Sequence, residues 1–401
     1  MSDDTPVFVD FAQIPLGFTS DQDIFDSNGT KLLAAGCELN ETIRNQVLAR
    51  GDTAISLPKA CEKRTPSARP EVKREFQETG SLCDQRIDRS GEDLSEERAA
   101  RFEKQAQVTL DVIASLGPMI NSVDSEIAAK IAELPGNMTQ MLLEDADQAI
   151  ATLGNSSELA NRCARLCMLT INTGIELGLD DEDVNKIGLA ALLHDLSLFL
   201  MPEKFRDPSA PLSQDEIWEY RRHPTLLNVS KGGTTISDEV CVIASQVHER
   251  ADGSGYPRGL KSHLLHPLSP ILHLVDSYQT LAMPGPGRPP VMPHDAMAWL
   301  LHEGLRGAHS PKTTRAFISQ LSLFPIGSDI ELDNGATATV IRRDQAHYAR
   351  PVVRVHGTDA PPLALSKSPI NILRPVSNPK KPQMRLTADE ISKLSFSDFQ
   401  H

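Results

Sequence analysis

Histidine and aspartate side chains stand inside apolar helical segments in the second half of this chain. His194 and Asp195 end the apolar run that begins at Gly188, and Asp276 lies in the run that begins at Ile271. A carboxylate is almost never buried unless it is paired or bound to a metal ion. Adjacent helical residues point about 100° apart, so His194 and Asp195 reach one ion only if it lies beside their shared edge. The pattern predicts helices packed around a polar centre.

Two further histidines extend this set. His223 begins the segment HPTLL, and His248 stands in the segment VHERADGSGYP. Four helices that present His and Asp side chains inward make a metal site in a bundle core. We expect one or two divalent ions, since mixed imidazole and carboxylate ligands favour iron, manganese or zinc over calcium. The predicted ligands are His194, Asp195, His223, His248 and Asp276.

Apolar periodicity divides the chain into five segments. The helical spacing of Phe102, Ala106, Leu110 and Ile113 opens a long all-helical region, and short β-like runs follow Phe324. We therefore predict a mainly α protein. Its segments are a small N-terminal α+β module at 1–57, a polar linker at 58–100, an all-helical domain at 101–324, a small β module at 325–376 and a polar tail at 377–401.

Local signals support the two small modules. Val7–Phe11 predicts a short strand, and Asn40 predicts the cap of a helix that reaches about Arg50. The run Asp333-Asn334-Gly335 is a tight-turn signal between two β-like runs.

Charge and composition exclude several kinds of partner. The net charge of −14 does not attract polyanions, so we expect no long nucleic acid. A small anionic ligand is compatible with this charge, because a bound metal reverses the local field. No apolar run approaches the roughly 20 residues of a membrane helix, so we expect no membrane insertion. The first residues lack the basic segment of a signal peptide, which predicts a cytoplasmic protein.

The segment from His248 to Pro257, HERADGSGYP, resembles the signature of the HD-GYP family. The His194-Asp195 pair, the His223-Pro224 dipeptide and the Asp276 segment match that family in order and spacing, over about residues 140–320. The resemblance implies an all-α HD-type domain that holds two or three metal ions, commonly iron or manganese. It also implies hydrolysis of the bacterial second messenger cyclic di-GMP or a related small nucleotide.

The resemblance assigns roles to individual residues. Asp195 is expected to be catalytic as well as a metal ligand. The loop at residues 253–257 is expected to shape the substrate face, because its glycines permit close backbone approach and its tyrosine can stack or form a hydrogen bond. The predicted substrate-binding residues are Gly253, Gly255, Tyr256, Pro257 and Arg288.

The sequence departs from the family at four places. Leu198 replaces a lysine near the phosphates, and Val247 replaces the first of two adjacent histidines. Arg162 stands near the position of an upstream histidine, where it would repel a cation or replace its charge. Arg288 is the basic residue left in a rearranged loop after the Asp276 helix.

Other residues near these positions are candidates to compensate. Glu158 could act as a substitute ligand, and His273 shares a helical face with Asp276, although it could equally be a surface or supporting histidine. The histidines without a matching context are expected at the surface: His263, His266, His294, His302 and His309.

Three functions remain open from the sequence. The first is an active cyclic di-GMP phosphodiesterase with a reduced or rearranged metal site. The second is a signalling module that has lost the chemistry and binds a nucleotide or a protein partner such as a diguanylate cyclase. The third is a metal-dependent hydrolase of another phosphate ester. The fold alone does not decide among them.

Overall fold

The computed structural model describes residues 7–10, 24–26, 31–33, 39, 54–57, 81–89, 95–116, 125–154, 156–226, 236–285, 288–377 and 382–393. The chain divides into two compact units, Met1–Glu78 and Thr79–His401, and each is described by itself. Within the described residues, no helix is long and apolar enough to cross a membrane.

The first unit contains a four-stranded antiparallel sheet. The strand order is β1-β4-β2-β3, with β1 at Val7–Asp10, β2 at Ile24–Asp26, β3 at Lys31–Leu33 and β4 at Ala54–Leu57. The first of these is the strand expected from residue 7. The helix expected between Asn40 and Arg50 lies outside the described residues.

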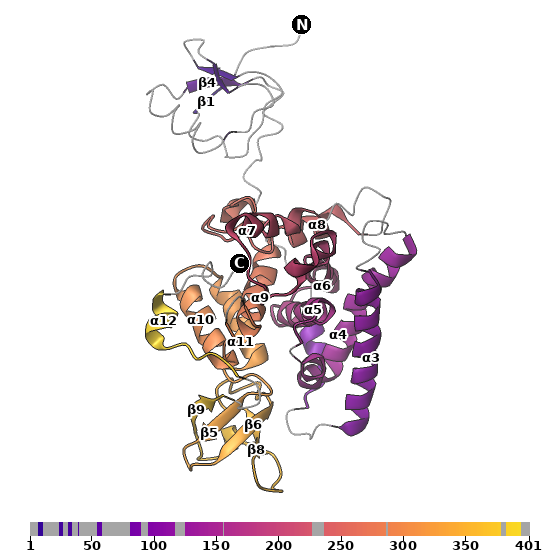
Figure 1. Ribbon diagram of the computed structural model, residues 1–401, viewed down its shortest axis with the longest axis vertical. Coiled ribbons are helices and arrows are strands. Elements are labelled where there is room, and N and C mark those ends of the chain that lie inside the picture. Colours follow the sequence, from indigo (N-terminus) through magenta and orange to yellow (C-terminus); the bar gives the residue numbers. More distant parts are fainter. Residues whose placement is uncertain are drawn as a thin grey trace. The chain divides into compact units, whose positions relative to one another are not determined.

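The second unit is mainly helical. Its α-helices are α3 (Glu96–Leu116), α4 (Ser125–Leu153), α5 (Leu159–Glu176), α6 (Asp181–Leu193), α7 (Gln214–Tyr220), α8 (Asp238–Ser245), α9 (Ser269–Ala282), α10 (Pro293–Leu305), α11 (Pro311–Leu321) and α12 (Ala388–Lys393). Helix α5 lies at the centre, since nearly all of its side chains are buried and it packs against α3, α4, α6, α9 and α11 (Figure 1).

Capping residues set the starts of the helices that lead into the candidate site. The Asp180 side chain accepts a hydrogen bond from the backbone N–H of Asp183 at the start of α6. Ser213 and Glu216 form a capping box at α7, and Ser237 caps α8. Each such cap contributes about 1 kcal/mol to helix stability. These three helices end just before the histidines of the candidate site.

The C-terminal region carries the predicted β module. Five antiparallel strands lie in the order β8-β7-β6-β5-β9, with β5 at Asp329–Leu332, β6 at Thr337–Arg342, β7 at Val352–Val355, β8 at Leu363–Ala364 and β9 at Ile372–Val376. The predicted turn joins β5 to β6, where Gly335 has φ +83°. The sheet buries a small aliphatic core: Ile330, Leu332, Ala338, Val340, Val353 and Leu365. The prediction of a mainly α protein with a small β module is confirmed.

The predicted polar linker is too long at its C-terminal end. Leu82 is buried in the helical core, and the backbone N–H of Ile87 donates to the carbonyl of Leu143 at 3.0 Å. The Arg86 guanidinium donates to Glu176 at 3.0 Å. Residues 81–89 therefore pack on the helical domain, and α3 begins before the predicted boundary at residue 101. The polar composition of residues 81–89 did not reveal that they pack on the domain, because Leu82 is the only buried apolar residue among them and the Arg86–Glu176 pair supplies a further contact.

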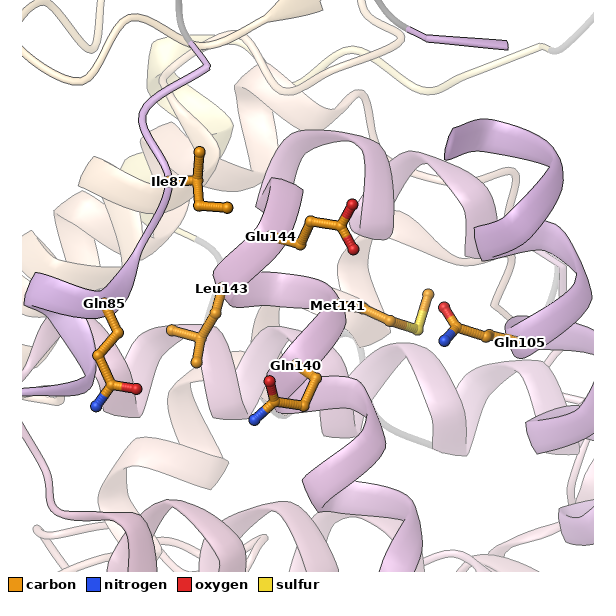
Figure 2. Close-up of a pocket in the computed structure, with 7 residues that line it drawn as sticks. All are labelled: Gln85, Ile87, Gln105, Gln140, Met141, Leu143 and Glu144. Atoms are coloured by element: carbon orange, nitrogen blue, oxygen red, sulfur yellow. The ribbon is translucent and has the colours of Figure 1, made fainter. Parts of the chain in front are cut away.

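This segment borders a pocket of about 270 Å³ between itself, α3 and α4 (Figure 2). Its lining residues are Gln85, Ile87, Gln105, Gln140, Met141, Leu143 and Glu144. The titratable side chain of this lining, Glu144, is paired with Arg98 at 3.7 Å and with Arg101. The pocket therefore presents amide and apolar groups rather than a catalytic set.

Candidate metal centre

His194 is the C-terminal cap of α6, and its ring is anchored by the backbone. Its Nδ1 lies 2.8 Å from the carbonyl oxygen of Ala191. Because a carbonyl only accepts hydrogen bonds, Nδ1 carries the proton. The lone pair of a neutral ring is then on Nε2, which lies 3.2 Å from Oδ1 of Asp195 and 3.9 Å from Oδ1 of Asp276. Two acceptors face each other there, and a proton or a metal ion would satisfy both.

His223 follows α7 and is anchored in the same way. Its Nδ1 donates to the carbonyl of Tyr220 at 2.8 Å, which leaves Nε2 at 3.5 Å from Oδ1 of Asp195. Burial, with the neighbouring His248, lowers the pKa of His223 to about 3, so the ring is neutral at pH 7. Metal-binding histidines are typically oriented by such a bond from the other ring nitrogen.

His248 follows α8 and joins the two halves of the cluster. Its Nε2 lies 3.2 Å from Nε2 of His223, and its Nδ1 lies 3.2 Å from Oδ2 of Asp276. Asp276 comes from the middle of α9 and is buried. Burial would raise the pKa of Asp276, but His248 and His194 outweigh this effect and lower it. The five predicted ligands, from widely separated segments, therefore lie in one cluster.

Asp195 is shared between the imidazoles and a guanidinium group. Its Oδ2 accepts a hydrogen bond from Nη2 of Arg162 at 2.9 Å. Burial would raise the pKa of Asp195, but His194, Arg162 and His223 outweigh burial and hold it well below its usual value. Oδ2 of Asp195 is therefore held by a guanidinium, while its Oδ1 faces the Nε2 atoms of His194 and His223.

The donor set fits a divalent ion chemically. Ligand atoms about 2.1 Å from a metal lie roughly 3.0–3.4 Å apart in octahedral to tetrahedral sites. The two 3.2 Å separations, from His194 to Asp195 and from His248 to Asp276, are in this range. Among the described side chains, no three His, Cys, Asp or Glu already surround a common point as a metal site would. The donors instead touch one another directly.

Glycine lets the loop at residues 253–257 fold back over this cluster. A Cβ on Gly255 would lie 2.4 Å from the carbonyl oxygen of His248 and 2.4 Å from the backbone nitrogen of Arg250. The same approach lets the Tyr256 N–H donate to the His248 carbonyl at 3.1 Å. The Tyr256 ring then stacks on the His248 ring, with centroids 4.7 Å apart and planes at 22°. Gly253 has φ +82°, which favours glycine.

Glu249 anchors this loop, a role that the sequence analysis missed. Its buried carboxylate accepts hydrogen bonds from the backbone N–H groups of Arg258 and Leu260, both at 2.8 Å. The signal was present, because an acidic residue directly after a buried histidine needs partners. The partners were hidden, since they are backbone groups about ten residues further along the chain.

A cavity of about 60 Å³ opens onto the cluster. Asp195, His248, Tyr256, Asp276 and Arg288 line it, whereas His194, His223, Gly253, Gly255 and Pro257 do not. Arg162, Tyr220 and Gln279 also line it, and these residues were not predicted as substrate contacts. The Arg288 guanidinium donates to the carbonyls of Met283 and Thr280, both at 3.0 Å, so it borders the cavity while it caps the end of α9.

Two of the four departures from the family pattern, Leu198 and Val247, lie in the core. Leu198 and Val247 are fully buried, and the Val247 carbonyl accepts a hydrogen bond from Nδ1 of His273 at 2.9 Å. His273 is thus a buried histidine rather than a surface one, and Glu158 is exposed at the start of α5.

The prediction that His309 lies at the surface is wrong, because it is buried beside His273 with ring centroids 5.3 Å apart. A single histidine without a motif gave no signal of this pairing.

Comparisons with known proteins find a domain match and several similar proteins. Residues 137–306 match the family model of the HD domain. The cyclic di-GMP phosphodiesterase PA4108 of Pseudomonas aeruginosa is 28% identical over 201 residues, which are 47% of this chain and 46% of that protein. The 3'3'-cGAMP-specific phosphodiesterase 1 of Vibrio cholerae is 30% identical over 152 residues, 38% of this chain and 34% of that protein. The solved structure of Bd1817, a HDG"Y"P protein from Bdellovibrio bacteriovorus, covers 78% of this chain and 98% of that chain, with 18% identity and a TM-score of 0.47.

Residues 137–306 of the chain match the HD domain, and the chain resembles proteins of the HD-GYP family. The matched residues, 137–306, agree with the extent expected from the motifs. The family resemblance and the mainly helical fold are therefore confirmed. The chain spans less than half the length of the two curated relatives compared here.

Proposed function

We propose that the chain is a metal-dependent phosphodiesterase that hydrolyses a cyclic dinucleotide, cyclic di-GMP or a close relative. The observation that carries this proposal is the convergence of three imidazoles and two carboxylates in one buried cluster, of which Asp195, His248 and Asp276 line a cavity. Two of the chain's relatives are named as phosphodiesterases of cyclic di-GMP and of 3'3'-cGAMP.

In this proposal the metal ligands are His194, Asp195, His223, His248 and Asp276. HD-domain phosphohydrolases depend on a divalent metal, and the family resemblance favours iron or manganese. A bound divalent ion lowers the pKa of a coordinated water and neutralises phosphoryl oxygens. The anchored rings of His194 and His223 keep their lone pairs available without rearrangement.

The chain's own residues orient the substrate. Burial raises the pKa of Tyr256 well above its usual value, so its hydroxyl stays protonated and can donate to a phosphoryl oxygen. The pKa of Tyr220 is raised for the same reason, and both tyrosines line the cavity. Arg288 supplies positive charge at the cavity rim. The close approach of the loop at Gly255 places the Tyr256 ring against one face of the His248 ring.

A second function is supported by the apolar residues in family positions. Leu198 brings no charge to the site, and Val247 brings no imidazole. A chain with such a site could act as a module that binds the nucleotide, or a signalling protein such as a diguanylate cyclase, without hydrolysis. The cytoplasmic location expected from the sequence suits either function and remains a prediction.

The test is a hydrolysis assay on protein purified without air and loaded with Mn²⁺ or Fe²⁺. Formation of the linear dinucleotide is followed by chromatography, for the wild type, Asp276→Asn and the control His263→Ala. His263 is exposed and outside the cluster. We expect turnover in the wild type and the control, and its loss in Asp276→Asn. No turnover in the metal-loaded wild type, with retained binding of cyclic di-GMP in calorimetry, would establish the binding module instead.

A further inference from the structure

Arg162 occupies a cationic position beside Asp195. The residue lies on the central helix α5 and only 6% of its surface is exposed. Its Nη2 contacts Oδ2 of Asp195 at 2.9 Å, while Oδ1 of the same carboxylate faces the rings of His194 and His223. A carboxylate that bridges two metal ions offers one oxygen to each. Here Oδ1 of Asp195 faces the Nε2 atoms of His194 and His223, and its Oδ2 is held by the guanidinium of Arg162.

The guanidinium is fixed in this place by further elements. Nη1 of Arg162 donates to the carbonyl of Arg206 at 3.0 Å. The backbone carbonyl of Arg162 accepts a hydrogen bond from Gln279 on α9 at 3.0 Å. The guanidinium is thus held by two separate segments of the chain, and the backbone of Arg162 is held by a third. It cannot turn away without breaking buried hydrogen bonds, which are costly to leave unsatisfied.

Charge favours one divalent ion over two. The cluster holds the two carboxylates Asp195 and Asp276 and the guanidinium of Arg162. Imidazoles bind a metal ion in their neutral form, so the two carboxylates and the guanidinium give the cluster one net negative charge before an ion binds. One divalent ion brings the cluster to +1, and two would bring it to +3 in a buried setting, where charges interact strongly.

We infer that Arg162 takes the place of one metal ion, so that this HD domain holds a single divalent ion beside a built-in guanidinium. The inference rests on the metal-binding part of the proposed function. The guanidinium supplies the second positive charge against Asp195, and it lines the cavity where a phosphoryl oxygen would lie. Arg162 is therefore both a positioning residue for Asp195 and a substrate contact.

The test is metal stoichiometry, which does not depend on turnover. Metal-free protein is saturated with MnCl₂, separated from free ions and analysed for manganese by elemental analysis. Electron paramagnetic resonance of the same samples distinguishes an isolated Mn²⁺ ion from an exchange-coupled pair. The variants are Arg162→His, which offers a ligand, and Arg162→Lys, which keeps the positive charge. Circular dichroism checks that each variant is folded.

We expect one Mn²⁺ per chain with an uncoupled signal in the wild type and in Arg162→Lys, and up to two ions with exchange coupling in folded Arg162→His. Zero or two ions in the wild type would overturn the inference, whatever happens in the variants. The proposed function is separable from this result. One ion without hydrolysis would leave the inference standing and refute the phosphodiesterase, whereas two ions with hydrolysis would do the reverse.

Discussion

Replacement of Gly255 by alanine tests whether the loop geometry holds the candidate site together. The added Cβ would lie 2.4 Å from the carbonyl oxygen of His248 and 2.6 Å from the Cα of Glu249, both backbone atoms that cannot rotate away. Ordinary contact begins at 3.4 Å, so the loop must move by roughly 1 Å. That shift breaks the bond from the Tyr256 N–H to the His248 carbonyl and displaces the stacked ring.

The magnitude follows from these contacts. Forcing extra atoms into a packed region costs about 1–3 kcal/mol, and a lost hydrogen bond costs about 1 kcal/mol more. We therefore expect Gly255→Ala to lower the free energy of unfolding by about 2–4 kcal/mol in urea denaturation. Because His248 is displaced, we expect Mn²⁺ affinity to fall by roughly 10–100-fold. Where the wild type hydrolyses substrate, a 1 Å displacement costs on the order of 100-fold in kcat/KM.

Gly136→Ala is the matched control. Gly136 is exposed within α4, and a Cβ there meets no atom within 4 Å. The substitution should stabilise the helix by up to about 1 kcal/mol and leave Mn²⁺ affinity unchanged. If Gly255→Ala behaved like this control in both measurements, the reasoning from the close backbone approach would be wrong.

Three further predictions concern a buried ion pair, the pH dependence of stability and the binding of a metal ion. Arg342→Ala removes a buried pair with Asp145 at 3.1 Å, while Asp145 keeps its pair with Arg98 at 2.8 Å, so we expect a loss of about 2–3 kcal/mol in urea denaturation. Arg374→Ala removes an exposed pair with Glu331 and should cost at most about 1 kcal/mol. Equal losses in the two variants would contradict this reasoning. Burial, with Arg250, lowers the pKa of His273 to about 4 in the folded chain. As the pH falls below about 6.5, His273 therefore takes up a proton in the unfolded chain before it does so in the folded chain. Stability should therefore decline between pH 6.5 and 4 by about 3 kcal/mol from this group, and His273→Asn should flatten that part of the profile. Mn²⁺ at 100 times its Kd should stabilise the metal-free protein by about 2.7 kcal/mol, measured by thermal unfolding with and without a chelator; no shift would argue against metal binding by the folded state.

Much of the fold followed from periodicity. Helical spacing predicted the helical domain, and the turn at Asn334-Gly335 predicted the pairing of β5 with β6, because such turns fix their own register. The segment near Leu82 was missed, since it packs through a few side chains whose partners are far along the chain. Local sequence carries no record of such distant partners.

The residues of the candidate site could be predicted from the sequence, but the hydrogen bonds that hold them in place could not. His194, Asp195 and Asp276 stood out because polar groups in apolar helices need partners. Their role as ligands stays a prediction, although the structure brings them together with His223 and His248. The anchoring of the rings could not be foreseen, because the acceptors are backbone carbonyls that any sequence supplies.

The arginine beside Asp195 relates the charge of the site to the charge of the substrate. An unpaired charge buried in the cluster is strongly unfavourable, so the second carboxylate must be balanced by a metal ion or by a proton on an imidazole. His223 does not hold that proton at pH 7, because its pKa is lowered to about 3 by burial and His248. With one divalent ion the cluster carries +1, and a phosphodiester carries one negative charge. One ion together with Arg162 therefore balances a single phosphodiester of a cyclic dinucleotide, whereas two ions in the same place would leave two positive charges unmatched.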